Sequence, residues 1–181
     1  MVPIGYMFKR IALRPAWLQV DSVTDIWSVS SCISPHFTDY VRFWLHNGYW
    51  LFDSPETAEA IAKRENIDLS DATLCYYEAY EDEFDGDQKS WSAITPEESF
   101  VTDVRPPNGS KLVGYDVVTF SVRTTPECSP LSCNAIATQL PVNAHCLLRT
   151  LDEARSALEA GVFENSEPGP FRILAVYTVD R

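Results

Sequence analysis

Two helix-start signals limit the folds that this chain can adopt. Ser54-Pro55-Glu56 places an N-cap hydroxyl before a proline at the first helical position, where the missing N–H removes no hydrogen bond. Thr150-Leu151-Asp152-Glu153 has the pattern of a capping box, in which the glutamate side chain reaches back to the N-cap amide. Helices are therefore predicted to begin at Pro55 and at Leu151.

Two further short helices are predicted from weaker signals. Thr38 offers an N-cap hydroxyl, and apolar residues recur at helical spacing from Phe37 to Leu45, just before Asn47-Gly48. Ser129 is a second candidate N-cap with Pro130 at the first helical position, and a helix is predicted over residues 131–139. Four short helices are thus expected.

Apolar runs with the spacing of β-strands lie between these helices. The predicted strands are residues 6–13, 23–33, 73–80, 115–123 and 171–179, and two short apolar runs cover 49–52 and 145–148. Short strands interspersed with short helices predict an α+β fold with a mixed or antiparallel sheet. Residues 88–110 contain three prolines and are predicted to form a linker or a long surface loop.

The order of these elements occurs twice along the chain. A constant shift in numbering superposes Cys32 on Cys128, Asn47 on Asn143 and Ser54 on Thr150. We therefore predict one compact domain, 1–181, made of two similar β-α-β-α-β halves, 20–85 and 112–181, about a pseudo-two-fold axis. The alternative is that two unrelated runs of common helix signals produce the same order.

The charge of the chain restricts its partners. It carries 26 acidic and 14 basic side chains, a formal charge of −12. Such a surface repels phosphate backbones, so we expect no nucleic-acid binding, but it attracts a basic protein. The alternative is that the acidity only maintains solubility.

The sequence also indicates a compartment. No apolar run approaches the roughly 20 residues that a membrane span requires. Five cysteines, an odd number, follow an N-terminus that has no secretory leader. We therefore expect a soluble protein of a reducing, bacterial-type cytoplasm.

The strongest local bias is an acidic segment, defined as residues 78–87, in which Tyr80 and Phe84 are interleaved with carboxylates. Its order of acids does not match an EF-hand loop, so we expect no Ca²⁺ there. Aromatic anchors and steering charges are typical of a surface that binds a basic partner. The predicted partner-binding residues are Glu78, Tyr80, Glu81, Asp82, Glu83, Phe84, Asp85 and Asp87. The alternative is a solvated strand end and hairpin tip.

Cys133 is the residue most suggestive of chemistry. Behind the expected N-cap it would lie in the first helical turn, where unpaired N–H groups favour a thiolate. Cys128 lies just before the cap, and His145 is a candidate base for such a nucleophile. The alternative is that both thiols are packed in the core.

The cysteines and histidines also permit a zinc site. Its ligands would be drawn from Cys32, His36, Cys128, Cys133, and one of His145 or Cys146. No Cys-x2-Cys pair occurs, however, and two adjacent residues of a strand point to opposite faces. We therefore predict no metal and no cofactor.

These observations favour a non-catalytic protein. No nucleotide-binding, metalloprotease or hydrolase motif is present in the sequence. We interpret Trp44, Tyr49 and Trp50 as core residues. The expected function is binding of a basic protein partner, in the manner of an inhibitor or immunity protein. The alternative is a cysteine-dependent enzyme or redox protein that uses Cys133 with Cys128 or His145.

Overall fold

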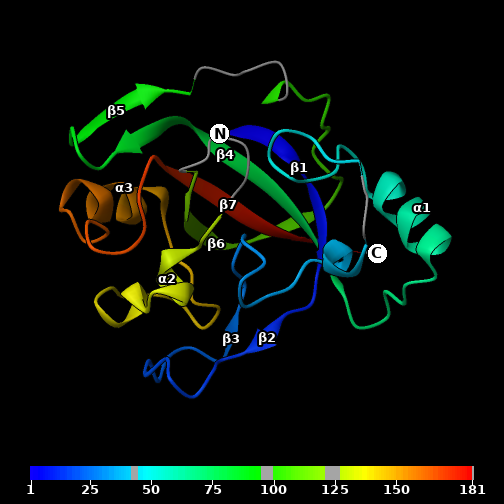
Figure 1. Cartoon of the computed structure of the whole chain (residues 1–181), viewed down its shortest axis with the longest axis horizontal. Coiled ribbons are helices and arrows are strands. Elements are labelled where there is room, and N and C mark those ends of the chain that lie inside the picture. The colour runs from blue at the N-terminus through cyan, green and yellow to red at the C-terminus, as the bar shows by residue number, and fades with distance from the viewer. Residues whose placement is uncertain (42–44, 95–99, 121–126, 181) are drawn as a thin grey trace.

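The computed structural model describes residues 1–41, 45–94, 100–120 and 127–180 and has an α+β architecture (Figure 1). The strands are β1 (Val2–Lys9), β2 (Ala12–Leu13), β3 (Asp25–Ile26), β4 (Thr73–Asp85), β5 (Ser90–Ala93), β6 (Ser110–Thr119) and β7 (Phe171–Val179). The helices are α1 (Pro55–Glu65), α2 (Pro130–Cys133) and α3 (Leu151–Glu159), with 3-10 turns η1 (Phe37–Tyr40) and η3 (Ile136–Thr138).

The main sheet has the strand order β1-β4-β7-β6, and β5 pairs with the outer part of β4. Each of these pairings is antiparallel, and β2 and β3 form a separate antiparallel ribbon. The long strand β4 therefore spans the sheet from its pairing with β1 to the hairpin that it forms with β5. The sheet predicted as mixed or antiparallel is antiparallel.

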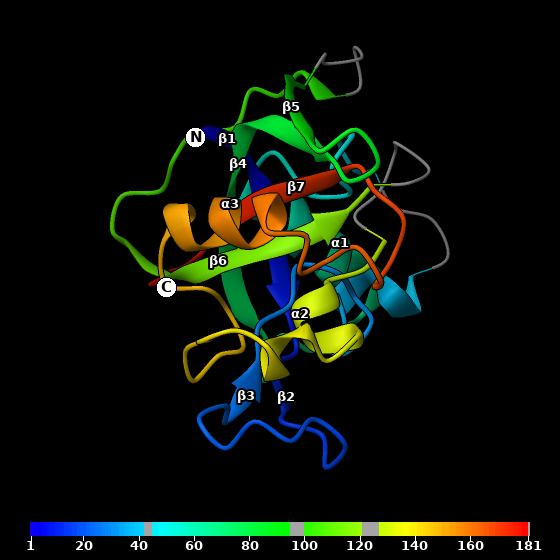
Figure 2. The same ribbon diagram turned by 90° about the vertical axis from the view of Figure 1, so that its left-hand side faces the viewer.

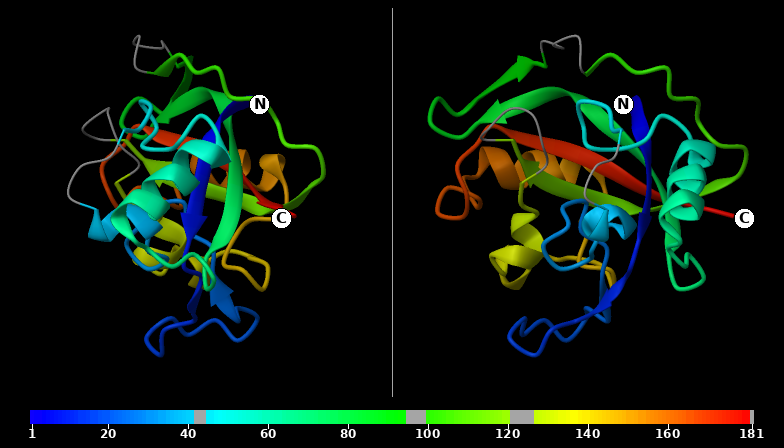
Figure 3. Two further views of the ribbon diagram at one scale, coloured as in Figure 1. Left: turned by 90° about the vertical axis from the view of Figure 1, so that its right-hand side faces the viewer. Right: turned by 45° about the vertical axis from the view of Figure 1, so that its right-hand side comes forward.

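The sheet is covered on both faces by apolar side chains. Along β7, Phe171 and Ile173 pack into one cluster with α3, whereas Leu174 and Val176 pack into another with α1. Figure 2 shows α3 lying across β6 and β7, and Figure 3 shows α1 beside β1 at the other end of the molecule. Within the described residues, no helix has the length and the apolar run needed to cross a bilayer.

Both strong helix-start signals are confirmed. The Ser54 hydroxyl accepts a hydrogen bond from the amide of Thr57, with Pro55 at the first position of α1. Thr150 and Glu153 form the predicted capping box at the start of α3. Local side chains determine these two boundaries, which is why the sequence predicts them.

The helix predicted from Phe37 to Leu45 is wrong. In the described part of this stretch, residues 37–41 and 45, the chain forms only the 3-10 turn η1, and Leu45 is 84% exposed. The Asp39 carboxylate accepts from the amide of His36, which is the residue that begins the turn, and Val41 is extended and ends it. Trp44 lies outside the described residues.

The helix predicted over residues 131–139 is also wrong, because it is split in two. α2 ends after one turn, Ala135 adopts a positive φ of 56°, and η3 follows. The Ser129 hydroxyl makes no capping hydrogen bond and donates instead to buried Asp116, at 2.6 Å. The chain therefore has three α-helices in its described residues, where four were expected.

The strands were predicted unevenly. β7 has the predicted bounds, and β4 begins as expected but continues into the acidic segment. The strand predicted over residues 23–33 shrinks to β3, and the loop predicted over 88–110 contains β5, while its residues 95–99 lie outside the described chain. β6 starts at Ser110, and the predicted end of that strand, 121–123, also falls outside the described residues.

Two asparagines attach neighbouring loops to the sheet with the same set of hydrogen bonds. The amide of the Asn143 side chain donates to the carbonyl of Val113 at 2.8 Å, and its oxygen accepts from the backbone amides of His145 and Leu147. Asn47 bonds in the same way to Ile4, Tyr49 and Leu51. Each asparagine therefore satisfies backbone groups on two segments at once.

Replacing Asn143 with alanine is expected to lower the free energy of unfolding by about 2 kcal/mol, because it leaves part-buried backbone groups without partners. Asn165→Ala is the matched control, since Asn165 is exposed on the loop before β7, and should change stability by less than about 0.5 kcal/mol. Urea unfolding of both variants checks the prediction. Equal losses would show that the Asn143 hydrogen bonds contribute nothing.

Candidate binding groove and thiol cluster

The fold uses part of the acidic segment internally. The hydroxyls of Tyr76 and Tyr177 each donate to the Glu78 carboxylate at 3.0 Å. Burial, with Glu78 beside the ring, raises the pKa of Tyr177 to about 12. Phe84 is buried in the core. Glu78 and Phe84, both predicted to bind a partner, therefore contribute to packing and hydrogen bonding within the chain.

Tyr80 is half-buried between the β4–β5 hairpin and α3. Its ring makes an edge-to-face contact with Trp91, and the Arg155 guanidinium lies 5.5 Å from the ring centre. The Trp91 indole in turn donates to Glu159 at 2.8 Å. These contacts hold the hairpin against α3.

Three further acids of the segment line a groove of about 600 Å³ between the β4–β5 turn and the loop that leads into β7. The carboxylates in its lining are Glu83, Asp85, Asp87, Glu164 and Glu167, and the only lining cation among the described residues is Lys89. Lys89 pairs with Glu164 at 2.7 Å. The groove is therefore lined by five carboxylates against one ammonium group.

Internal hydrogen bonds orient several of these carboxylates. Arg172 holds Glu83 through two nitrogens, each 2.9 Å from one oxygen. Asp85 accepts from the backbone amides of Asp87 and Gln88 at 2.9 Å and so shapes the turn. The acidic wall of the groove is consequently preorganised by the turn and by the sheet.

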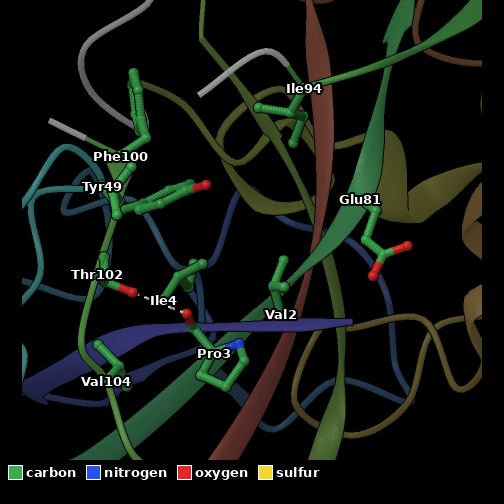
Figure 4. Close-up of a pocket in the computed structure, with 10 residues that line it drawn as sticks. Val2, Pro3, Ile4, Tyr49, Glu81, Ile94, Phe100, Thr102 and Val104 are labelled. Atoms are coloured by element: carbon green, nitrogen blue, oxygen red, sulfur yellow. Dashed lines mark hydrogen bonds between the residues drawn. The ribbon is translucent and has the colours of Figure 1, made fainter. Parts of the chain in front are cut away.

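An apolar pocket of about 360 Å³ lies further along the same hairpin. Figure 4 shows Glu81 on β4 at one side of it and Tyr49 and Phe100 at the other. Thr102 donates to the carbonyl of Pro3 at 3.2 Å and fixes the pocket wall to β1. Glu81 is exposed, and Asp82 beside it is half-buried. β4 thus supplies acids to both hollows.

The structure brings together three of the cysteines that were considered as zinc ligands, two of which were also the candidate nucleophile and its neighbour. The sulfur atoms of Cys32, Cys128 and Cys133 all lie within 4.8 Å of one another. The histidines considered as base or ligand lie elsewhere: His145 pairs with Asp25 at 2.6 Å, and His36 contacts the carbonyl of Val29.

The predicted activation of Cys133 depends on its place in the one-turn helix α2, of which it is the last residue. Its hydrogen bond with Cys128 lowers its pKa, but the hydrogen bond with Cys32 and burial raise the pKa, and the net direction is upward. Hydrogen bonds from the Cys128 and Cys133 thiols lower the pKa of Cys32 instead. Cys32, the thiol of the cluster whose pKa is lowered, was not predicted to be the nucleophile.

Two buried charges beside the cluster were missed from the sequence. Lys9 donates to the carbonyls of Val29 and Ser30, and burial lowers its pKa to about 7. Asp116 accepts from the amide of Val29 and from Ser129, and burial raises its pKa to about 6. The sequence did contain a sign of both: each is a charged residue inside a predicted apolar strand, Lys9 in residues 6–13 and Asp116 in residues 115–123.

Comparison with known proteins gives no assignment: no protein-family profile, no curated protein and no solved structure matches this chain.

Proposed function

We propose that this protein binds a basic segment of a partner protein in the acidic groove. The observation that supports this proposal is the set of five carboxylates, contributed by two segments far apart in sequence, against a single lining ammonium group. The formal charge of −12 over the whole chain adds long-range attraction for a cationic partner. The proposed role is that of a non-catalytic inhibitor or immunity-type protein.

The neighbouring apolar pocket supports the same proposal. Protein interfaces combine a desolvated apolar anchor with a polar rim that sets orientation and association rate. The pocket between Tyr49 and Phe100 is suited to an apolar side chain, and Glu81 at its edge to an adjacent basic group. A partner segment with one apolar anchor beside several Lys or Arg residues fits both hollows.

The geometry gives less support to the alternative of a thiol enzyme. Such an enzyme needs a general base within hydrogen-bond reach of its nucleophile. His145, the proposed base, is 2.6 Å from Asp25 and its ring packs on Trp27. We therefore propose binding, and not catalysis, as the function.

We also propose that the binding surface belongs to a single domain built from two related halves. The strand order β1-β4-β7-β6 supports this. A two-fold rotation that places β1 on β6 and β4 on β7 gives the same order of strands, read from the other edge of the sheet. The matching bonds of Asn47 and Asn143, and the bridges Tyr6–Phe52 and Tyr115–Leu148, fit the same relation. On this basis the first half would begin at β1, earlier than the residue 20 expected from the sequence.

Neutralising two groove acids is expected to weaken binding of a short Lys- and Arg-rich peptide by about 5-fold at low salt, because each exposed ion pair contributes about 0.2–1 kcal/mol. The test variant is Asp87→Asn with Glu164→Gln. Fluorescence anisotropy of the labelled peptide measures the dissociation constant. Raising the ionic strength should reduce affinity for the native chain more than for the variant, since salt screens exposed charges.

The matched control is Asp21→Asn with Glu59→Gln, which makes the same charge change at exposed positions outside the groove. This control should retain nearly native affinity. If both pairs weaken binding equally, the peptide responds to overall charge and the groove proposal is wrong.

A further inference from the structure

The thiol cluster of Cys32, Cys128 and Cys133 differs from the other cysteines of the chain. Within the cluster Cys32 is exposed, Cys133 is half-buried and Cys128 is buried, whereas Cys75 and Cys146 are both buried in the core. A cysteine that serves only as a small apolar residue is usually buried. Three thiols that converge from two distant segments at a partly open position therefore need another explanation.

We propose that this cluster binds a thiophilic divalent cation of the zinc class through three thiolate ligands. Zinc–sulfur bonds are about 2.3 Å long, so tetrahedral ligation places the sulfurs about 3.8 Å apart. The observed limit of 4.8 Å between any two sulfurs requires only small side-chain movements to reach that spacing. A disulfide would join two of the sulfurs and leave the third without a role, and its formation requires an oxidant.

A buried hydrogen-bond network holds the two cysteine-bearing segments in place. One Asp116 oxygen accepts from the amide of Val29, at 2.8 Å, and from the Ser129 hydroxyl. The same Ser129 oxygen accepts from the amide of Ser30 at 3.1 Å. The segment that carries Cys32 is thereby fixed to the segment that carries the other two thiols. Outer groups of this kind orient metal ligands and contribute to metal affinity.

The surroundings suit a site with three protein ligands. Among the described residues, hydroxyl and carbonyl oxygens also lie near the sulfurs: the Ser30 and Ser132 hydroxyls, each 3.9 Å from Cys133, the Asn134 side-chain amide oxygen, 3.3 Å from Cys128, and the Glu127 carbonyl, 3.4 Å from Cys32. The exposed position of Cys32 leaves the fourth coordination position to water or to an external ligand, as in zinc sites that are not closed. Three thiolates with Zn²⁺ carry one net negative charge, and the protonated form of Lys9, which donates to Ser30 and interacts electrostatically with Cys32, would offset part of it.

The test is a titration of the reduced, metal-free chain with Zn²⁺, followed by calorimetry, and with Cd²⁺, followed by thiolate-to-metal charge-transfer absorption. One ion should bind per chain, with release of protons, because thiols must deprotonate to ligate. Cys32→Ser and Cys133→Ser should each weaken binding by at least about 100-fold, since loss of an outer hydrogen-bond partner alone costs 10–100-fold. Cys75→Ala, which removes a thiol outside the cluster, should leave binding unchanged.

Circular dichroism of each metal-free variant separates loss of ligation from loss of folding. If the buried substitution Cys128→Ser prevents folding, the test still rests on Cys32→Ser, because Cys32 is exposed and its substitution should leave the fold intact. Mass-spectrometric counting of alkylated cysteines adds a second readout, in which Zn²⁺ should protect Cys32. The proposal is overturned if the reduced chain takes up no ion, if Cys32→Ser binds as tightly as the native chain, or if the cluster forms a disulfide and never a metal complex.

Discussion

Replacing Gly114 with alanine is expected to destabilise the fold by about 3 kcal/mol or more, at the upper end of the cost of inserting an atom into a packed position. A Cβ at this position would lie 2.7 Å from both the Cβ of Leu147 and the carbonyl oxygen of Leu148. These are backbone-anchored atoms, so no side-chain rotation relieves the overlap. β6 and the 143–148 segment would have to separate, and the Asn143 and Tyr115–Leu148 hydrogen bonds would lengthen with them.

Gly5→Ala should have a similar effect, because a Cβ there would lie 2.6 Å from the Cβ of Leu51 and 2.9 Å from the carbonyl oxygen of Phe52, and because φ is +144°. Gly109→Ala is the matched control: its φ is +81°, but nothing lies within 4 Å of the added atom. That variant should lose only about 1 kcal/mol, from backbone strain. Urea midpoints for the three variants give the comparison. Losses at Gly5 or Gly114 no larger than at Gly109 would contradict the close-approach argument.

The features that the sequence predicted correctly are those that neighbouring residues determine. Ser54 and Thr150 cap their helices because each hydroxyl accepts a hydrogen bond from the backbone amide three residues later in the chain. The apolar run of β7 was likewise sufficient to predict its bounds. The Ser129 cap failed because a distant carboxylate, Asp116, offers that hydroxyl a stronger partner in a buried position.

The candidate sites depended on contacts that spacing along the chain does not encode. Glu83, Asp85 and Asp87 were predicted from local composition, but Glu164 and Glu167 complete the groove only because the loop before β7 lies beside the β4–β5 turn. Cys32 joins Cys128 and Cys133 because buried Lys9 and Asp116 hold an irregular segment where a strand was expected. A charged residue in an apolar strand thus marked the site better than the cysteine spacing did.

Lys9 is expected to produce a pH dependence of stability that Lys9→Met abolishes. Its ammonium group is 1% exposed and donates to the carbonyls of Val29 and Ser30. In the variant both carbonyls keep another partner, the His36 ring for Val29 and the Ser28 hydroxyl for Ser30, so the fold should persist. The titratable groups that face Lys9 among the described residues are Cys75 from β4, Asp39 from η1, Asp116 from β6, Cys32 and His36.

The sign follows from proton binding. Burial lowers the pKa of Lys9 from 10.5 to about 7 in the folded chain, so between these values the unfolded chain binds more protons. This contribution to stability is therefore complete above the unfolded pKa and is lost as pH falls toward 7. From about pH 10 to about pH 7 the native chain should lose about 3 kcal/mol relative to Lys9→Met. Asp116, whose pKa burial raises to about 6, titrates below this interval.

Urea unfolding of the native chain and of Lys9→Met, measured across that pH interval, gives the difference directly. Titrations of groups that do not face Lys9 occur in both proteins and cancel in the comparison, whereas those of Cys32 and Cys75 are coupled to Lys9 and belong to the difference. Lys63→Met, at an exposed position on α1, should follow the native chain throughout. Parallel curves for Lys9→Met and the native chain would mean that Lys9 titrates in the folded protein as it does in water, and that its burial carries no electrostatic cost.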